Sequence, residues 1–225
     1  MTRRYRPRMI YELRRYAMRP GRRDTLISLF EREFIETQEA TGMLVPGSFR
    51  EVGRPDRFTW LRAFPDMEKR RASLEAFYSG PVWQAHRDEA NATLADSDDV
   101  LLLRPAGPPP PLWERPPVGA TALPPALYVA TVHHVRPGFS AFFAREAAPV
   151  LADAGVPPVA CFETEHAENT YPRLPVRTGV NVFVWFARFD SPEKEREVDL
   201  PMLAPHLTAP SLRLRLRPTA RSAMR

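Results

Sequence analysis

The organisation of this chain follows from residues 9–21, which read MIYELRRYAMRPG. Apolar and polar side chains alternate over residues 9–18 as they do in a strand, and Pro20-Gly21 ends the run with a turn. Residues 126–138 read ALYVATVHHVRPG and carry a tyrosine and an Arg-Pro-Gly at the same spacing, 117 positions further on. This match predicts two copies of one unit.

Three further matches follow in the same order along the chain. Gly42 and Phe49 correspond to Gly155 and Phe162, FTWLRAFPD from position 58 corresponds to FVWFARFDS from position 183, and LRP from 103 corresponds to LRP from 216. The second copy has a 12-residue insertion before its Phe-x-Trp segment. Four ordered matches exclude a chance similarity.

Within each copy the spacing of apolar residues alternates between the two-residue period of a strand and the 3.6-residue period of a helix, in the order β-α-β-β-α-β. In the first copy we expect strands at 9–18, 45–52, 57–64 and 100–104, a helix from 24, and a helix from 65 interrupted at 79–81. This order is typical of a ferredoxin-like unit. Before its last strand the second copy has 22 residues (190–211) where the first has 35 (65–99), so we expect it to lack the restarted helix.

Proline marks the boundary between the copies, with nine prolines in residues 105–125. Such a stretch favours a semi-rigid linker over a docking motif. We therefore divide the chain into a basic extension at 1–8, a domain at 9–105, a linker at 106–125, a diverged second domain at 126–220 and a basic tail at 221–225.

Composition excludes several classes of protein. Hydrophobic residues make up 44% and charged residues 26% of the 225, which is typical of a globular protein, and no apolar run is long enough to span a membrane. The net charge of +5 comes from nine arginines in residues 1–8 and 213–225, and arginine outnumbers lysine 30 to 2, a compositional bias of bacterial type. We therefore expect neither nucleic-acid nor membrane binding. The single cysteine, Cys161, can form neither an intramolecular disulfide nor a thiolate metal cage, so neither an oxidising compartment nor a zinc fold is implied. We expect a cytoplasmic protein.

Several segments of the first copy resemble the NIPSNAP family. They are residues 9–16 with Arg-Pro-Gly at 19–21, Phe77-Tyr78, Gly-Pro-Val-Trp at 80–83, His86-Arg87 and Asn-Ala-Thr at 91–93. The resemblance implies the dimeric α+β barrel superfamily, in which two four-stranded sheets face each other and close a barrel. We therefore expect an α+β fold of two tandem ferredoxin-like domains that form an intramolecular barrel. The resemblance implies no settled reaction, and it is compatible with a homo-oligomer.

Strand parity divides each predicted sheet into two faces. We assign Leu13, Leu61 and Ala63 to the face under the helices. The opposite face, which we expect inside the barrel, then carries Glu12, Arg14, Tyr16, Phe58, Trp60 and Arg62 of the first copy and Thr131, His133, Phe183 and Trp185 of the second.

Six of these residues form the predicted ligand site, namely Arg14, Tyr16, Trp60, Arg62, His133 and Trp185. Aromatic walls with a few polar groups are typical of a small-molecule pocket, and Arg14 or Arg62 would meet an acidic group. Glu12, Tyr16 or His133 are candidates for acid–base catalysis. The alternative is that Glu12 pairs with an arginine and the aromatic side chains merely fill the barrel.

The restarted helix carries a reserve site of Trp83, His86, Arg87 and Asn91, of which Trp83 and His86 share one face. We expect His86 to be a structural core histidine. The alternatives are a general base or a haem ligand, but no other haem signal is present, so we predict no cofactor.

Glu163, Glu165, His166 and Glu168 lie near the insertion and favour a solvated loop over a metal site, so we predict no metal. The sequence also lacks phosphate-binding glycine loops and hydrolase or metalloprotease motifs.

The sequence supports two alternative functions. The first is a protein that binds, and as an enzyme would transform, a small apolar or aromatic molecule in the barrel. The second is a non-catalytic interaction or oligomerisation module, which a filled barrel would favour.

Overall fold

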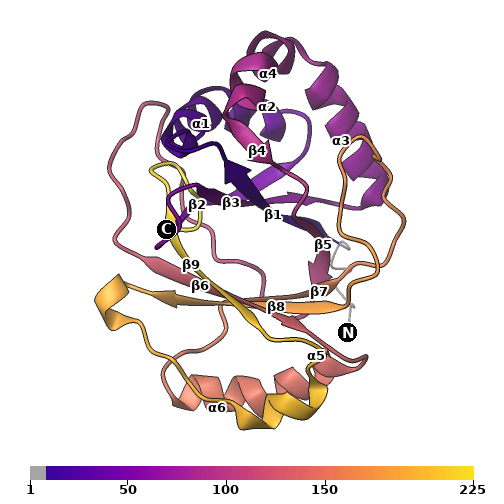
Figure 1. Cartoon of the computed structure of the whole chain (residues 1–225), viewed down its shortest axis with the longest axis vertical. Coiled ribbons are helices and arrows are strands. Elements are labelled where there is room, and N and C mark those ends of the chain that lie inside the picture. The colour runs from indigo at the N-terminus through magenta and orange to yellow at the C-terminus, as the bar shows by residue number, and fades with distance from the viewer. Residues whose placement is uncertain (1–8) are drawn as a thin grey trace, which may run out of the picture.

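Eight antiparallel strands close a barrel within one chain. The computed structural model describes residues 9–225, so the predicted extension at 1–8 lies outside the described residues. The strands follow one another in the order β3-β2-β9-β6-β8-β7-β5-β1, and pairing of β1 with β3 closes the ring (Figure 1). Their bounds are Ile10–Met18 (β1), Leu44–Glu51 (β2), Arg57–Phe64 (β3), Val100–Pro105 (β5), Leu127–His134 (β6), Ala160–Thr164 (β7), Val182–Phe189 (β8) and Leu212–Pro218 (β9). The short strand β4 (Leu94–Asp96) adds to the end of β1.

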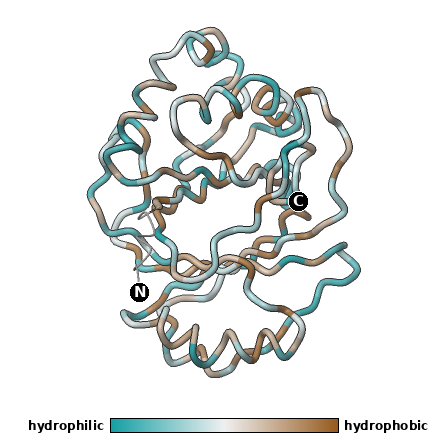
Figure 2. Tube along the Cα trace, turned by 180° about the vertical axis from the view of Figure 1, so that it is seen from behind, coloured by the Kyte–Doolittle hydropathy of each residue, from teal (hydrophilic) through white to brown (hydrophobic). Residues whose placement is uncertain are grey.

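Helices cover the barrel on two opposite sides (Figures 1 and 2). On the first side lie α1 (Arg23–Leu29), η1 (Phe30–Phe34), α2 (Ile35–Glu39), α3 (Met67–Ser79) and α4 (Pro81–Thr93). On the second side lie α5 (Phe139–Phe142), η2 (Phe143–Ala147), α6 (Ala148–Asp153), η3 (Pro192–Lys194) and η4 (Pro201–His206). None of the helices between residues 9 and 225 is both long and apolar enough to cross a membrane.

The helices of the first half begin and end close to the predicted residues, but the second half has no α-helix between β8 and β9, where the sequence analysis expected to lose only the restarted helix. The Asp66 side chain accepts a hydrogen bond from the backbone N–H of Lys69 at 2.7 Å and caps the start of α3. Gly80 ends α3, and Pro81 opens α4 at the position where its missing N–H costs nothing. In the second half the short 3₁₀ turns η3 and η4 stand where the first half has α3 and α4.

The barrel interior is filled by apolar side chains, and this corrects the predicted faces. Leu13, Leu61 and Ala63 belong to a buried cluster that draws residues from all eight barrel strands. Trp60 packs instead against the first layer of helices, and Trp185 against the second. The parity prediction was therefore right about which residues share a face and wrong about which face lies inside the barrel.

The last residues of the chain are packed, although their charge sets them apart as a basic tail. Met224 is fully buried in the barrel cluster, and Arg221 is 3% exposed. The guanidinium of Arg221 donates to the Glu36 carboxylate on α2 and to the carbonyl oxygen of Pro116. The chain end therefore ties the barrel to the first helical layer and to the proline-rich segment.

Candidate functional site

Two neighbouring strands carry a row of polar and aromatic side chains beneath the first helical layer. In the antiparallel register of β1 and β3, Glu12 lies opposite Arg62 and Arg14 opposite Trp60. Tyr16 continues the row on β1, because every second residue of a strand points to the same face. All five side chains are buried.

Glu12 binds three arginines at once. Its Oε2 atom accepts hydrogen bonds from Arg14 at 2.7 Å and from Arg62 at 2.6 Å, and its Oε1 atom accepts one from Arg70 on α3 at 2.6 Å. Burial alone would raise the pKa of Glu12, but the attraction of the three guanidinium groups outweighs it and holds that pKa well below its usual range. Glu12 is therefore a permanent anion that bridges the sheet and α3.

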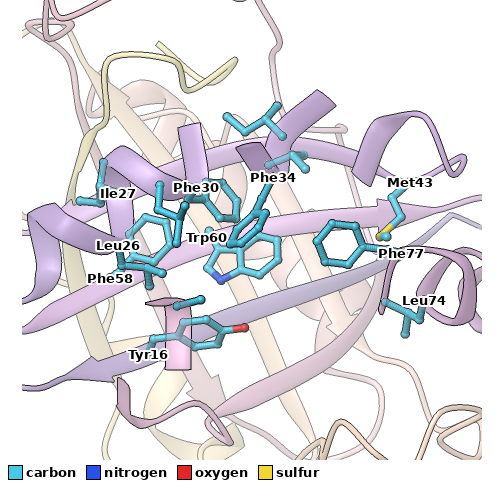
Figure 3. Close-up of a cluster of buried hydrophobic side chains, with 14 of the residues drawn as sticks. Tyr16, Leu26, Ile27, Phe30, Phe34, Met43, Phe58, Trp60, Leu74 and Phe77 are labelled. Carbon is cyan, nitrogen blue, oxygen red and sulfur yellow. The ribbon is translucent and has the colours of Figure 1, made fainter. Parts of the chain in front are cut away.

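An aromatic pocket adjoins this charged cluster between the sheet and the helices (Figure 3). Phe30 lies edge-on to Trp60 at 4.9 Å between ring centroids, and Tyr16 lies edge-on to it from the other side at 5.9 Å. The side chains leave a cavity of about 50 Å³. Its walls are Tyr16, Leu26, Phe30, Phe34, Gln38, Trp60, Phe77, Tyr78, Trp83, Ala90 and Leu94.

The charged cluster lies directly against the wall of this pocket. The guanidinium carbon of Arg62 is 5.3 Å from the centre of the Trp60 ring, and that of Arg14 is 5.8 Å from it. Arg14 also donates from Nε to the Tyr16 hydroxyl at 3.0 Å. The site therefore combines an apolar, aromatic lining with a positively charged neighbourhood, in a cavity much smaller than the roughly 300–1,000 Å³ of an ordinary small-molecule pocket.

A turn of π-helix stands over each of the two corresponding tryptophans. In the first half η1 brings Phe30 against Trp60, and in the second half η2 brings Phe143 to 5.9 Å from Trp185. Wide helical turns of this kind are frequent at functional sites.

A loop from the second half covers the charged end of the first-half site. It contains the 12-residue insertion between β7 and β8 and runs beside α3, in orange in Figure 1. Asn169 accepts a hydrogen bond from Arg70 at 3.0 Å, and the Tyr171 ring stacks on Tyr78 at 6.0 Å. Asn169 and Tyr171 therefore close this end of the site, whereas His166 and Glu168 earlier in the same loop are exposed, as expected of a solvated loop.

The structure brings together only part of the predicted ligand site. Tyr16 and Trp60 line the pocket together with Trp83 of the reserve site. Arg14 and Arg62 lie behind this wall, in contact with Tyr16 and Trp60. His133 and Trp185 line another cavity, of about 400 Å³, on the second side of the barrel. One site formed by all six residues inside the barrel is therefore not what the structure shows.

His133 has both ring nitrogens occupied. Nε2 accepts a hydrogen bond from the Trp185 indole at 3.1 Å, so Nδ1 carries the proton and donates it to the Ser211 hydroxyl at 2.6 Å. Burial lowers the pKa of His133 to about 4. The ring is thus neutral near pH 7 and holds its neighbours in place.

The residues of the reserve site on α4 do not lie together in one site. His86 is not a buried core residue, because 28% of its side chain is exposed and its Nε2 lies 3.9 Å from the Glu33 carboxylate. Arg87 is an exposed side chain that donates to Gln84 at 3.0 Å, and Asn91 is also exposed. Only Trp83 of this group reaches the pocket.

The residues predicted as candidates for acid–base catalysis are poorly suited to that role. Glu12 is held as an anion by three arginines and is unsuited to accept a proton. Burial raises the pKa of Tyr16, which favours its neutral, hydrogen-bonding form. Among residues 9–225 no three histidine, cysteine, aspartate or glutamate side chains are grouped as metal ligands would be.

Sequence reasoning missed Arg70, Tyr78 and Tyr171. Arg70 shares the buried face of α3 with Leu74 and Phe77, at the spacing of three and four expected of a helix, so an arginine on an apolar stripe was the available signal. Tyr171 carries no local signal, because its partner Tyr78 lies far away along the chain.

The fold and the site together define an α+β barrel protein with a pocket between its helices and its sheet. Residues 11–107, a little less than half of the chain, match the profile of the NIPSNAP family. No protein with a curated description matches the chain at a significant level.

Solved structures with the same overall fold cover nearly the whole chain. A candidate monooxygenase from Fusobacterium nucleatum subsp. nucleatum ATCC 25586 has a TM-score of 0.63 at 9% identity, covering 94% of this chain and 93% of its own. A candidate monooxygenase from Lactobacillus acidophilus NCFM has a TM-score of 0.58 at 11% identity, covering 96% and 97%. An uncharacterised NIPSNAP-like domain protein from Burkholderia xenovorans is 29% identical over 48% of this chain and 97% of its own, with a TM-score of 0.42. At 9% and 11% identity the first two show the fold alone.

Proposed function

We propose that this chain binds a small apolar or aromatic molecule in the pocket between the first helical layer and strands β1 and β3. The observation that carries the proposal is the cavity lined by Tyr16, Phe34, Trp60 and Trp83, which adjoins buried polar groups. Such a volume offers stacking surfaces to an aromatic ring. Apolar side chains from all eight strands occupy the barrel interior, which favours the interaction-module alternative over a ligand inside the barrel. The proposal of ligand binding therefore rests on the pocket beside the barrel alone.

A small ligand enters this pocket by displacing side chains, because the cavity of about 50 Å³ holds only a few water molecules as it stands. Trp83 and Tyr78 are only partly buried and lie at the wall, so they are the side chains expected to move. The proposed function is binding. An oxygenase reaction is not carried over from the structural neighbours, which share only the fold.

We also propose that each half is a ferredoxin-like unit, with domains at 9–105 and 126–220. In each half the first strand lies between the third and fourth strands of that half, and the second strand pairs with the third. This common order supports an origin by duplication. Because one chain closes the barrel, no second copy is needed to complete it.

The experiment is a thermal-shift screen with small aromatic compounds, both charged and neutral. A ligand present at 100 times its Kd stabilises the protein by about 2.7 kcal/mol, which is readily measured. Ala90→Met fills the proposed pocket, and Ala187→Met is the matched control because Ala187 lines the cavity on the other side of the barrel. We expect stabilisation that is lost in Ala90→Met and kept in Ala187→Met. The opposite pattern, or no stabilising compound, contradicts the proposal.

A further inference from the structure

The buried cluster beside the pocket carries more positive than negative charge. Arg14, Arg62 and Arg70 are each fully buried, and Glu12 is the one carboxylate within 4.0 Å of any of them among the described residues. The side chains that complete their surroundings, such as those of Tyr16 and Asn169, are neutral. Two buried positive charges therefore remain uncompensated, and buried charges are normally paired.

The cluster also has more hydrogen-bond donors than acceptors. Nη2 of Arg62, Nη2 of Arg70 and Nε1 of Trp60 are buried and have no hydrogen-bond partner within residues 9–225. All three are donors, so the group that would satisfy them is an acceptor. Burial also lowers the pKa of Arg70, and the attraction of Glu12 does not fully offset it.

The second half shows how the same tryptophan is satisfied when it needs no ligand. Trp185 occupies the position of Trp60 in the repeat and donates to His133, which occupies the position of Tyr16. In the first half the Tyr16 hydroxyl accepts from Arg14 instead, and the Trp60 indole keeps a free donor. In Figure 3 the indole nitrogen lies on the side of the Trp60 ring that faces Tyr16.

The free donors belong to neighbouring side chains. Arg62 and Arg70 bind the same Glu12 carboxylate, and the Arg62 guanidinium is 5.3 Å from the centre of the Trp60 ring. Two acid oxygens can therefore accept from an indole N–H and a guanidinium N–H at once, as in charge-assisted pairs.

We infer that the ligand of this pocket is a small organic acid bound as its anion. Its acidic oxygens accept hydrogen bonds from Trp60 and Arg62, and its apolar or aromatic body lies among Phe30, Phe34 and Phe77. This inference rests on the proposed function, since it names the class of molecule that the same pocket binds.

The test compares two probes of nearly equal shape, phenylacetate and phenylacetamide, by isothermal titration calorimetry at pH 7. We expect the acid to bind about 10- to 150-fold more tightly than the amide, the range for a hydrogen bond to a charged group. Trp60→Phe removes one donor and keeps an aromatic wall, so it should weaken phenylacetate by about 10-fold or more and leave phenylacetamide nearly unchanged. Arg62→Met should reduce the difference in affinity between phenylacetate and phenylacetamide.

Trp185→Phe is the matched control, because it removes the corresponding indole from the other half and should change neither affinity. If phenylacetamide binds as tightly as phenylacetate, or if Trp60→Phe leaves the phenylacetate affinity unchanged, the inference is overturned while the pocket stands. If neither probe binds the wild-type chain, the proposed function is overturned and the inference with it.

Discussion

Replacing Glu12 by glutamine tests whether the buried cluster depends on a single carboxylate. Glu12 is fully buried and accepts charged hydrogen bonds from Arg14, Arg62 and Arg70 at 2.6–2.7 Å. Glutamine has nearly the same shape, but it brings no negative charge. The variant Glu12→Gln therefore leaves three buried arginines without a counter-charge.

Loss of one partner from a buried ion pair costs about 3–5 kcal/mol. Since about 1 kcal/mol shifts the melting temperature of a chain of this size by about 2–4 °C, Glu12→Gln should melt about 6–20 °C below the wild type. Glu163→Gln is the matched control, because Glu163 pairs with Arg104 at the surface and such a pair contributes at most about 1 kcal/mol.

The effect should also depend on pH. The folded state holds the pKa of Glu12 well below its usual 4.5, so the carboxylate stabilises the fold above that pH. This contribution begins to fall below pH 4.5 and disappears only as the pH approaches the much lower folded pKa, so the stability gap between wild type and Glu12→Gln should narrow by up to about 1 kcal/mol from pH 7 to pH 4. Calorimetry at pH 7 and at pH 4 measures both effects. A variant that melts within 2 °C of the wild type at pH 7 would refute the reasoning.

Three further measurements address the tryptophans, the buried histidine and the covering loop. Trp185→Phe leaves His133 without a donor, whereas Trp60→Phe breaks no hydrogen bond, so urea denaturation should find Trp185→Phe less stable by about 1 kcal/mol or more. Burial lowers the pKa of His133 from 6.5 to about 4, so the unfolded chain binds the extra proton first and stability should fall by about 2 kcal/mol from pH 7 to pH 5. His133→Gln should remove most of that fall, and an unchanged pH profile would contradict the assignment. Tyr171→Ala removes the ring stacked on Tyr78 and should speed phenylacetate release by about 2- to 10-fold in stopped-flow fluorescence, with the exposed Arg173→Ala as a control that changes nothing.

The elements of this fold were predictable because their signals are local. The alternation in residues 9–18, the capping Asp66 and the Gly80-Pro81 break each act within a few residues, and the structure places β1, α3 and α4 accordingly. The repeat extended this prediction to the second half. The structure also shows how the two halves join to close the barrel, because β2 pairs with β9 and β5 pairs with β7.

The face of the sheet that lines the pocket was not predictable in the same way. In this barrel both faces of β1 and β3 are buried, one against the other strands and one against the helices, so Leu13 and Trp60 are equally hidden from water. Parity separates two such faces but does not say which is the inner one. The polar side chains on one face suggested that this face lines an open barrel interior. In the structure Glu12 instead forms hydrogen bonds with Arg14 and Arg62 beneath the helices.

By itself, the sequence predicted the strands of both halves, the helices of the first half and the sets of residues that share a face, while the duplication of one unit stays a prediction. Local backbone preferences and hydrophobic periods suffice for these. Only the tertiary structure decided that Arg70 from α3 joins Glu12, and that Asn169 and Tyr171 from the second half close the site of the first. These contacts join residues up to about 100 positions apart, and they form because packing the two halves into one barrel brings the insertion against α3.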